Sequence, residues 1–166
     1  NMLEIPNDFV EPEIKKLHSP VRLGSLGRLS GEKQYSSVVQ SLEILKSSGI
    51  TAEFFLAGEG EDKKYIETII QELQLENQVK FLGWISDKKS FFESIDIFVL
   101  PSYAETFGIV LLEAMLYKIP VITGNSYGPT DIFENEIDGL IIPTGDRETI
   151  PGFLADAAFL TTFLAF

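Results

Sequence analysis

Two glutamates stand eight positions apart in the run over residues 101–115, and the second, Glu113, has apolar neighbours on both sides. A carboxylate is costly to bury among apolar side chains unless a partner compensates its charge. Glu113 must therefore form a bond within the fold, to the backbone or to a lysine, or bind a ligand. The residues after the first acid, Glu105, are expected to begin a helix whose unpaired backbone N–H groups attract anions. They are Thr106, Phe107, Gly108 and Ile109.

A second loop, over residues 24–33, combines three glycines (Gly24, Gly27 and Gly31) with two cations, Arg28 and Lys33. Glycine lets a ligand approach the backbone closely, and two cations on one loop can converge on an anion such as a diphosphate. The spacing matches neither the dinucleotide-binding fingerprint nor a Walker loop. A glycine-rich turn with solvated charges is the alternative explanation.

The single tryptophan, Trp84, follows another short apolar run. Its ring can pack in the core or lie against a planar base, and we expect core packing. The backbone beyond it, at Ile85, can still line a site. The turn over residues 58–60 is expected to serve as a turn and helix cap, and His18 is expected to be an ordinary loop residue.

Six short apolar runs alternate with longer segments of helical period, which is typical of a parallel sheet covered by helices. We therefore predict an α/β fold with a Rossmann-like, doubly wound parallel sheet of about six strands. Helices cover both of its faces in a three-layer α/β/α arrangement. Ligands bind such sheets beyond the carboxyl ends of the strands, where the loops described above lie. The predicted strands are residues 21–26, 52–57, 79–82, 95–100, 120–123 and 140–142.

Five helices are expected between these strands. The fourth is apolar apart from Glu113 and is expected to be buried. Ser86 or Asp87 is the expected N-cap of the third, and Pro129 is suited to the first turn of a short fifth helix. The other predicted ranges are residues 34–48, 62–75, 87–94 and 108–117.

The composition of the 166-residue chain excludes several functions. A hydrophobic content of 45% suits one domain with a real core, and a formal net charge of −12 argues against nucleic acid as a partner. With no cysteine and one histidine, thiolate chemistry and a metal site are not expected. The lack of cysteine agrees with a reducing compartment. We expect a cytoplasmic protein and leave open a peripheral membrane position of the full-length protein.

Three regions are predicted along the chain: an interdomain segment over residues 1–20, the body over residues 21–146, and an apolar tail over residues 147–166. No secretory signal is visible at the start. The tail is shorter than the roughly 20 residues that a membrane span needs, and it carries Asp156. We expect it to form a terminal helix that packs on the body or on a part not present.

The run over residues 101–115 resembles the donor-binding, C-terminal domain of group 1 (family 4) glycosyltransferases, which are retaining enzymes of the GT-B fold. The specific feature is the pair of Glu105 and Glu113 with Phe107-Gly108 between them. The resemblance extends over residues 2–146 and makes residues 21–146 the domain that binds the sugar donor. The other matching pieces are Ile5-Pro6-Asn7, Gly27-Arg28-Leu29 with Lys33, Gly58-Glu59-Gly60, Phe81-Leu82-Gly83-Trp84, Pro101-Ser102, Ile119-Pro120-Val121-Ile122 and Gly139.

This resemblance implies a nucleoside diphosphate sugar, such as a UDP- or GDP-sugar, as donor substrate, with no other cofactor. Arg28 and Lys33 would hold the diphosphate together with the amides of residues 107–109, and Glu105 would lie beside the donor sugar. These three side chains are the catalytic candidates. Glu113 would bond the ribose hydroxyls.

The remaining implied binding residues are Gly27, in the first loop, and residues 84–86, near the base. The sequence departs from the family pattern at Gln34, where glycine commonly follows the lysine, and at Tyr127-Gly128, where paired glycines are usual. The tail from Arg147 lacks the usual closing helix, and the N-terminal domain that holds the acceptor is missing. The resemblance therefore implies a fragment that binds the donor and does not complete transfer alone.

Two other functions fit the same residues. A nucleotide-sugar epimerase of the same architecture would release the sugar instead of transferring it. A non-catalytic nucleotide-binding or partner-binding module would use the apolar tail to dock on another chain.

Overall fold

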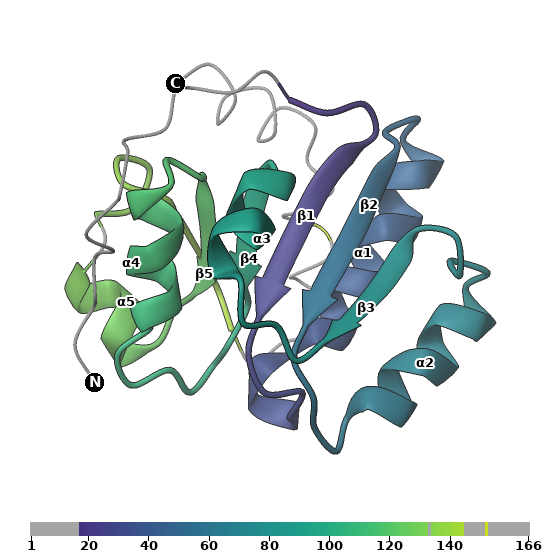
Figure 1. Cartoon of the computed structure of the whole chain (residues 1–166), viewed down its shortest axis with the longest axis horizontal. Coiled ribbons are helices and arrows are strands. Elements are labelled where there is room, and N and C mark those ends of the chain that lie inside the picture. The colour runs from purple at the N-terminus through teal and green to yellow at the C-terminus, as the bar shows by residue number, and fades with distance from the viewer. Residues whose placement is uncertain (1–16, 133, 145–151, 153–166) are drawn as a thin grey trace.

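The computed structural model describes residues 17–132, 134–144 and 152. Within them, six strands form one all-parallel sheet in the spatial order β3-β2-β1-β4-β5-β6 (Figure 1). The first strand, β1, lies at the centre of the sheet, and the chain then builds outward to β3 and crosses to β4 on the other side of β1. The connections therefore diverge between β1 and β4, which is where such sheets bind ligands. The strands are β1 (Val21–Leu26), β2 (Ala52–Ala57), β3 (Val79–Gly83), β4 (Ile97–Leu100), β5 (Val121–Gly124) and β6 (Leu140–Ile142).

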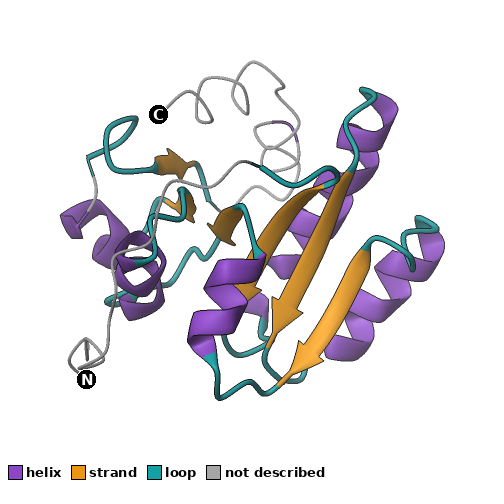
Figure 2. Ribbon diagram, turned by 45° about the horizontal axis from the view of Figure 1, so that its top comes forward, coloured by secondary structure: helices purple, strands orange, loops and turns teal. Residues whose placement is uncertain are grey.

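Helices lie on both faces of this sheet. Figure 1 shows α1 behind the strands, α3 in front of them and α2 beside β3, and the turned view in Figure 2 shows purple helices on both sides of the orange strands. The predicted three-layer α/β/α fold is confirmed. The helices are α1 (Tyr35–Ser47), α2 (Lys63–Glu72), α3 (Lys88–Ser94), α4 (Ile109–Leu116) and α5 (Tyr127–Ile132), and a 3-10 turn, η1 (Gly31–Lys33), precedes α1.

The centre of the sheet is apolar on both faces. All four residues of β4 are buried, as expected for a continuous apolar strand between two helical layers. The edge strand β3 is different, because Lys80 and Leu82 are exposed on it. Helix α4 was expected to be buried, but only Leu111 and Ala114 are. One stripe of α4 packs on β4 and β5, and its other apolar residues are partly exposed.

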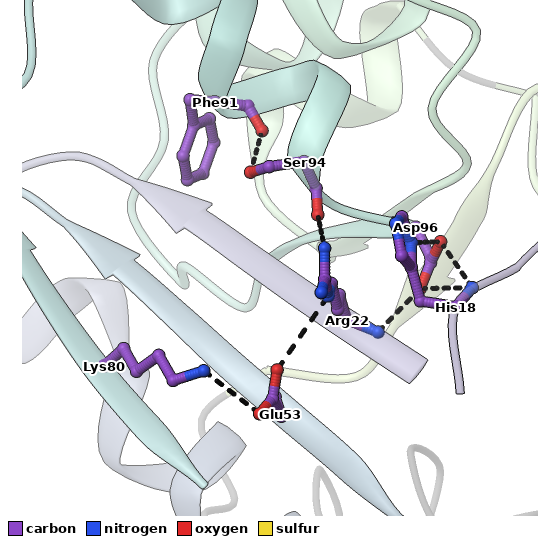
Figure 3. Close-up of polar contacts among 7 residues, drawn as sticks. All are labelled: His18, Arg22, Glu53, Lys80, Phe91, Ser94 and Asp96. Carbon is purple, nitrogen blue, oxygen red and sulfur yellow. Dashed lines mark hydrogen bonds and ion pairs between the residues drawn. The ribbon is translucent and has the colours of Figure 1, made fainter. Parts of the chain in front are cut away.

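Asp96, just before β4, ties three segments together at the amino end of the sheet (Figure 3). Its carboxylate accepts hydrogen bonds from the backbone N–H of Arg22 at 2.7 Å and from that of His18 at 3.1 Å. The His18 ring nitrogen Nδ1 also lies 2.7 Å from Asp96 Oδ1. The expectation that His18 is an ordinary loop residue is therefore wrong. Because Ile95 ends α3 and Asp96 turns its side chain inward, β4 begins two residues later than predicted.

The start of α3 is fixed by Asp87, one of the two predicted N-caps. Its carboxylate accepts a hydrogen bond from the backbone N–H of Ser90 at 3.0 Å and another from the Ser90 hydroxyl at 2.6 Å. These two bonds, the hydroxyl one first, lower the pKa of Asp87 below its ordinary value. Helix α5 begins at Tyr127, so Pro129 is its third residue and still lies in the first turn.

The predicted interdomain segment before residue 17 and the predicted tail over residues 147–166, Gly152 excepted, lie outside the described residues. Across the described part of the chain, no helix is long and apolar enough to cross a membrane.

Candidate functional site

A hollow of about 1120 Å³ opens at the carboxyl edge of the sheet. The loops that follow β1, β2 and β3 line it, together with the first residues of α3 and α4. This is the edge where the sequence predicted a ligand site. The lining residues are Leu26, Gly27, Arg28, Gly58, Glu59, Gly60, Glu61, Trp84, Ile85, Lys88, Ile109, Val110 and Glu113.

The floor of the hollow is backbone held by hydrogen bonds between neighbouring loops. Gly27 N–H donates to the carbonyl of Ala57 at 3.0 Å, and Gly58 N–H donates to that of Gly83 at 2.7 Å. A Cβ atom on Gly58 would collide with the carbonyl of Gly27, so this approach requires glycine. The turn over residues 58–60 therefore does more than cap a helix, because its backbone lines the site. The sequence does contain a sign of this role, because two glycines, Gly58 and Gly60, directly follow a predicted strand.

The Tyr35 hydroxyl lies close to Gly27. A Cβ atom on Gly27 would lie 2.8 Å from the Tyr35 hydroxyl. That hydroxyl is buried, and it has no hydrogen-bond partner among the described residues. Burial, and then the nearby carboxylates of Glu105 and Glu32, raise the pKa of Tyr35. Tyr35 therefore stays neutral beside the first loop.

Arg28 lies on the rim and pairs with Glu61 from the loop after β2. The Arg28 Nη2 atom is 3.1 Å from Glu61 Oε2, and the Nε atom is 3.3 Å from the same oxygen. Both side chains are exposed. A hydrogen bond from its own backbone N–H, followed by the bond from Arg28, lowers the pKa of Glu61. The pair is accessible and screened by water, so another anion can compete for Arg28.

Lys33 and Glu105, two of the predicted catalytic residues, pair with each other. Lys33 Nζ lies 2.5 Å from Glu105 Oε2, and both side chains are largely buried. The other oxygen of Glu105 accepts from Gly108 N–H at 3.2 Å. Neither residue lines the hollow. The expected gathering of Arg28, Lys33 and Glu113 around one hollow is thus incomplete, because Glu105 draws Lys33 to the loop after β4.

The helix start contributes less than predicted to the lining. Gly108 is the N-cap of α4 and adopts the left-handed conformation at φ 59°. Thr106 and Phe107 are exposed, and neither they nor Gly108 line the hollow. Ile109, the first residue of α4, does line it.

Glu113 faces the hollow from α4 and pairs with Lys88, the first residue of α3. Lys88 Nζ lies 2.7 Å from Oε1 of Glu113 and 2.9 Å from Oε2. The sequence left two alternatives for Glu113, a partner in the fold or a ligand. The structure shows a lysine partner that itself lines the hollow. The sequence did not single out Lys88.

The ring of Trp84 is 83% exposed, so the expectation that it packs in the core is wrong. Trp84 directly follows Gly83, the last residue of the edge strand β3. Both Trp84 and Ile85 line the hollow. An exposed indole at this place can lie against a planar ligand.

Charges of both signs surround the hollow. Arg28 and Lys88 are its cations, and Glu59, Glu61 and Glu113 are its carboxylates. Each cation is paired with one of these acids. The described residues include no cluster of three or more His, Cys, Asp or Glu side chains that could hold a metal ion.

Comparison with known proteins identifies the family of the chain. The family model of glycosyl transferases group 1 matches residues 8–154. The chain belongs to this family. It is 30% identical over 146 residues to the amylovoran biosynthesis glycosyltransferase AmsK of Erwinia amylovora, an alignment that covers 83% of this chain and 36% of AmsK.

Solved structures of glycosyltransferases share the fold. Alr3699/HepE of Anabaena, solved in complex with UDP-glucose, is 27% identical with a TM-score of 0.74, over 87% of this chain and 40% of that one. The C-terminal domain of the group 1 family protein LpcC of Francisella tularensis is 23% identical with a TM-score of 0.72, over 87% of this chain and 80% of that domain. The present chain spans about a third of the length of the curated relatives it matches.

The two departures from the group 1 pattern have clear structural outcomes. Gln34 adopts the left-handed conformation at φ 53°, so the turn keeps a shape that glycine favours. The Tyr127 side chain points into solvent. Gly128 N–H donates to the carbonyl of Glu105 at 3.0 Å, and a Cβ atom on Gly128 would crowd the backbone of residues 106–107. Only the second glycine of the usual pair is therefore required by packing here.

Proposed function

We propose that this chain is the donor-binding region of a retaining glycosyltransferase whose donor is a nucleoside diphosphate sugar, with UDP as the nucleotide. The observation that carries the proposal is the hollow at the switch point of the sheet, lined by both Arg28 and Glu113. Its volume suits a ligand of nucleotide size. The UDP-glucose complex of the related HepE supports the choice of nucleotide.

Arg28 and Lys33 are assigned to the diphosphate, together with the amides at the start of α4. An ammonium group has three donors and a guanidinium five. Lys33 does not line the hollow, so in this assignment the diphosphate extends from the hollow toward the loop after β4. There Lys33 can keep its bond to Glu105 and still donate to a phosphate oxygen, and Arg28 can do the same while it contacts Glu61. In this assignment Glu105 lies beside the donor sugar, at the side of the diphosphate away from the nucleoside.

Glu113 and Trp84 are assigned to the nucleoside. A carboxylate accepts hydrogen bonds from ribose hydroxyls through lone pairs that Lys88 does not use. The exposed indole of Trp84 offers an apolar surface to the base, and Ile85 lies beside it on the same wall.

In the proposed reaction, the bond between the anomeric carbon and the phosphate oxygen breaks and a bond to an acceptor oxygen forms on the same face of the sugar. Negative charge develops on the departing nucleoside diphosphate. Preorganised donors aimed at that charge lower the barrier, and loss of one typically costs about 10²- to 10³-fold in rate. Because the chain spans about a third of its relatives, we expect the isolated chain to bind the donor without completing transfer.

Titration of the chain with UDP, GDP and ADP tests the assignment. We expect saturable binding of UDP, weakened about tenfold or more by Lys33→Ala and by Glu113→Ala, because each removes a hydrogen bond to a charged group. Glu53→Ala, on the amino half of β2, should leave binding unchanged. Absence of binding at millimolar UDP would contradict the proposal. Product analysis with a protein that also carries the acceptor-binding region separates transfer from epimerisation and from mere binding.

A further inference from the structure

Lys88 connects two elements that meet at the hollow. It is the first residue of α3, and its ammonium group bonds both carboxylate oxygens of Glu113 in α4, 25 positions away. Both side chains line the hollow. Helix α3 is fixed at this end because Asp87 caps it through Ser90. The lysine therefore reaches Glu113 from an anchored position.

The two partners differ in exposure. The Glu113 side chain is 17% exposed and that of Lys88 is 50% exposed. A largely buried carboxylate with one cationic partner on its open side has little freedom to rotate. A glutamate without that partner regains its side-chain torsions and must lose them again on binding a ligand.

We propose that Lys88 is a positioning residue for nucleotide binding, which holds the carboxylate of Glu113 in the orientation that accepts the ribose hydroxyls. The inference rests on the proposed function and adds to it a residue outside the family motif. Lys88 acts through Glu113, so its effect depends on the ribose and not on the phosphates.

A simple structural role for the ion pair is the competing explanation, and the fold supplies a matched control. Lys80 and Glu53 form a pair of the same residue types at 3.0 Å, with side-chain exposures of 48% and 20%. That pair joins β3 to β2 near their amino ends, and neither residue lines the hollow (Figure 3). Lys80→Met thus removes a pair of the same residue types and similar exposure away from the site, although Glu53 also lies 3.8 Å from Arg22.

The test compares UDP with 2′-deoxy-UDP by isothermal titration calorimetry on the full chain. The wild type should prefer UDP about tenfold, as expected for a hydroxyl that donates to a carboxylate. Lys88→Met should reduce this preference to about twofold and change the affinity for 2′-deoxy-UDP little. Lys88→Arg should keep the preference, and Lys80→Met should match the wild type. Lys88→Gln serves as a second neutral variant, and thermal melting shows that each variant folds.

Two outcomes overturn the inference alone. One is an unchanged preference in Lys88→Met and Lys88→Gln. The other is an equal loss of affinity for both nucleotides, which would mean that Lys88 attracts the phosphates directly. If the wild type shows no saturable binding of UDP, that result contradicts the proposed function and, with it, this inference.

Discussion

At the scale of single residues, the site is organised by ion pairs between its own side chains. Lys33 pairs with Glu105, Arg28 with Glu61 and Lys88 with Glu113. Of these three pairs, only that of Arg28 and Glu61 has both side chains exposed, so solvent and salt compete most strongly there. In the proposed function, the diphosphate of the donor therefore replaces Glu61 readily as the partner of Arg28. The pairs of Lys33 with Glu105 and of Lys88 with Glu113 stay formed when the donor binds.

Gln34 is a residue whose backbone conformation conflicts with its side chain. It sits between η1 and α1 at φ 53°, and its buried side-chain oxygen Oε1 has no hydrogen-bond partner among the described residues. Glycine would remove the left-handed strain and the buried amide, at a smaller entropic cost. We expect Gln34→Gly to raise the free energy of unfolding by about 1 kcal/mol in urea titrations.

Gln34→Ala is the matched comparison, because alanine removes the amide but keeps the strain. It should be less stable than the glycine variant by about 1 kcal/mol. Equal stability of the two variants would show that the conformation at residue 34 carries no strain.

At the scale of elements, the hydrophobic pattern was sufficient for most of the sheet. The predicted strands over residues 21–26, 52–57 and 140–142 coincide with β1, β2 and β6, because continuous branched and aromatic runs fit a sheet covered on both faces. The pattern was not sufficient at Ile95-Asp96, where an apolar residue closes a helix and an acid turns inward. The hydrophobic pattern shows which residues are apolar, but it does not show which polar side chains accept hydrogen bonds from buried N–H groups.

The candidate site was predictable only in part, because contacts between side chains that are far apart in the sequence leave no local pattern. Strand ends and glycines located the edge of the sheet and the loops of Gly27 and Trp84. Nothing in the sequence tells which lysine faces Glu113 across 25 residues, or that Lys33 meets Glu105 across 72. The exposure of Trp84 depends on how the loop after β3 is placed, which local composition does not reveal.

The element most directly tied to the hollow is α3, and its cap is testable. Asp87→Ala removes both bonds to Ser90 and should lower the melting temperature by a few degrees at neutral pH. The folded-state pKa of Asp87 is lowered, so its stabilisation is fully present above the unfolded value, which lies near 3.8. It is lost as the pH falls through the still lower folded value.

Melting curves of the wild type and Asp87→Ala across a pH series check this dependence. The difference between the two should be constant at pH 5 to 7 and shrink at more acidic pH. Asp87→Asn, which keeps a capping oxygen, should fall between them. A difference that grows as the pH falls would contradict the assigned cap.

At the scale of the whole molecule, the carboxyl ends and the amino ends of the strands differ in role. The carboxyl edge carries the hollow, whereas the amino edge is held by Asp96. Asp96 joins His18, the second residue of β1 and the start of β4, and its side chain is almost fully buried. These bonds close the seam between β1 and β4, the pair of strands at which the order of the sheet reverses.

Asp96→Asn should therefore destabilise the fold while leaving the site geometry in place. The amide keeps the shape of the carboxylate, but it turns one acceptor into a donor that faces the N–H groups of His18 and Arg22. A buried donor left without an acceptor, together with loss of bonds to a charged group, costs about 3 kcal/mol. Urea unfolding followed by circular dichroism should show a lower midpoint with an unchanged slope.

His18→Ala separates the side-chain bond from the backbone ones. It removes the ring contact but leaves both backbone N–H donors on Asp96, so its loss of stability should be clearly smaller than that of Asp96→Asn. Under native conditions both variants should bind UDP with the affinity of the wild type, because β1 separates residue 22 from the loop of residues 27–28. Wild-type stability of Asp96→Asn would mean that the β1–β4 seam is held by apolar packing alone. A selective loss of UDP binding would mean that the two edges are coupled through β1.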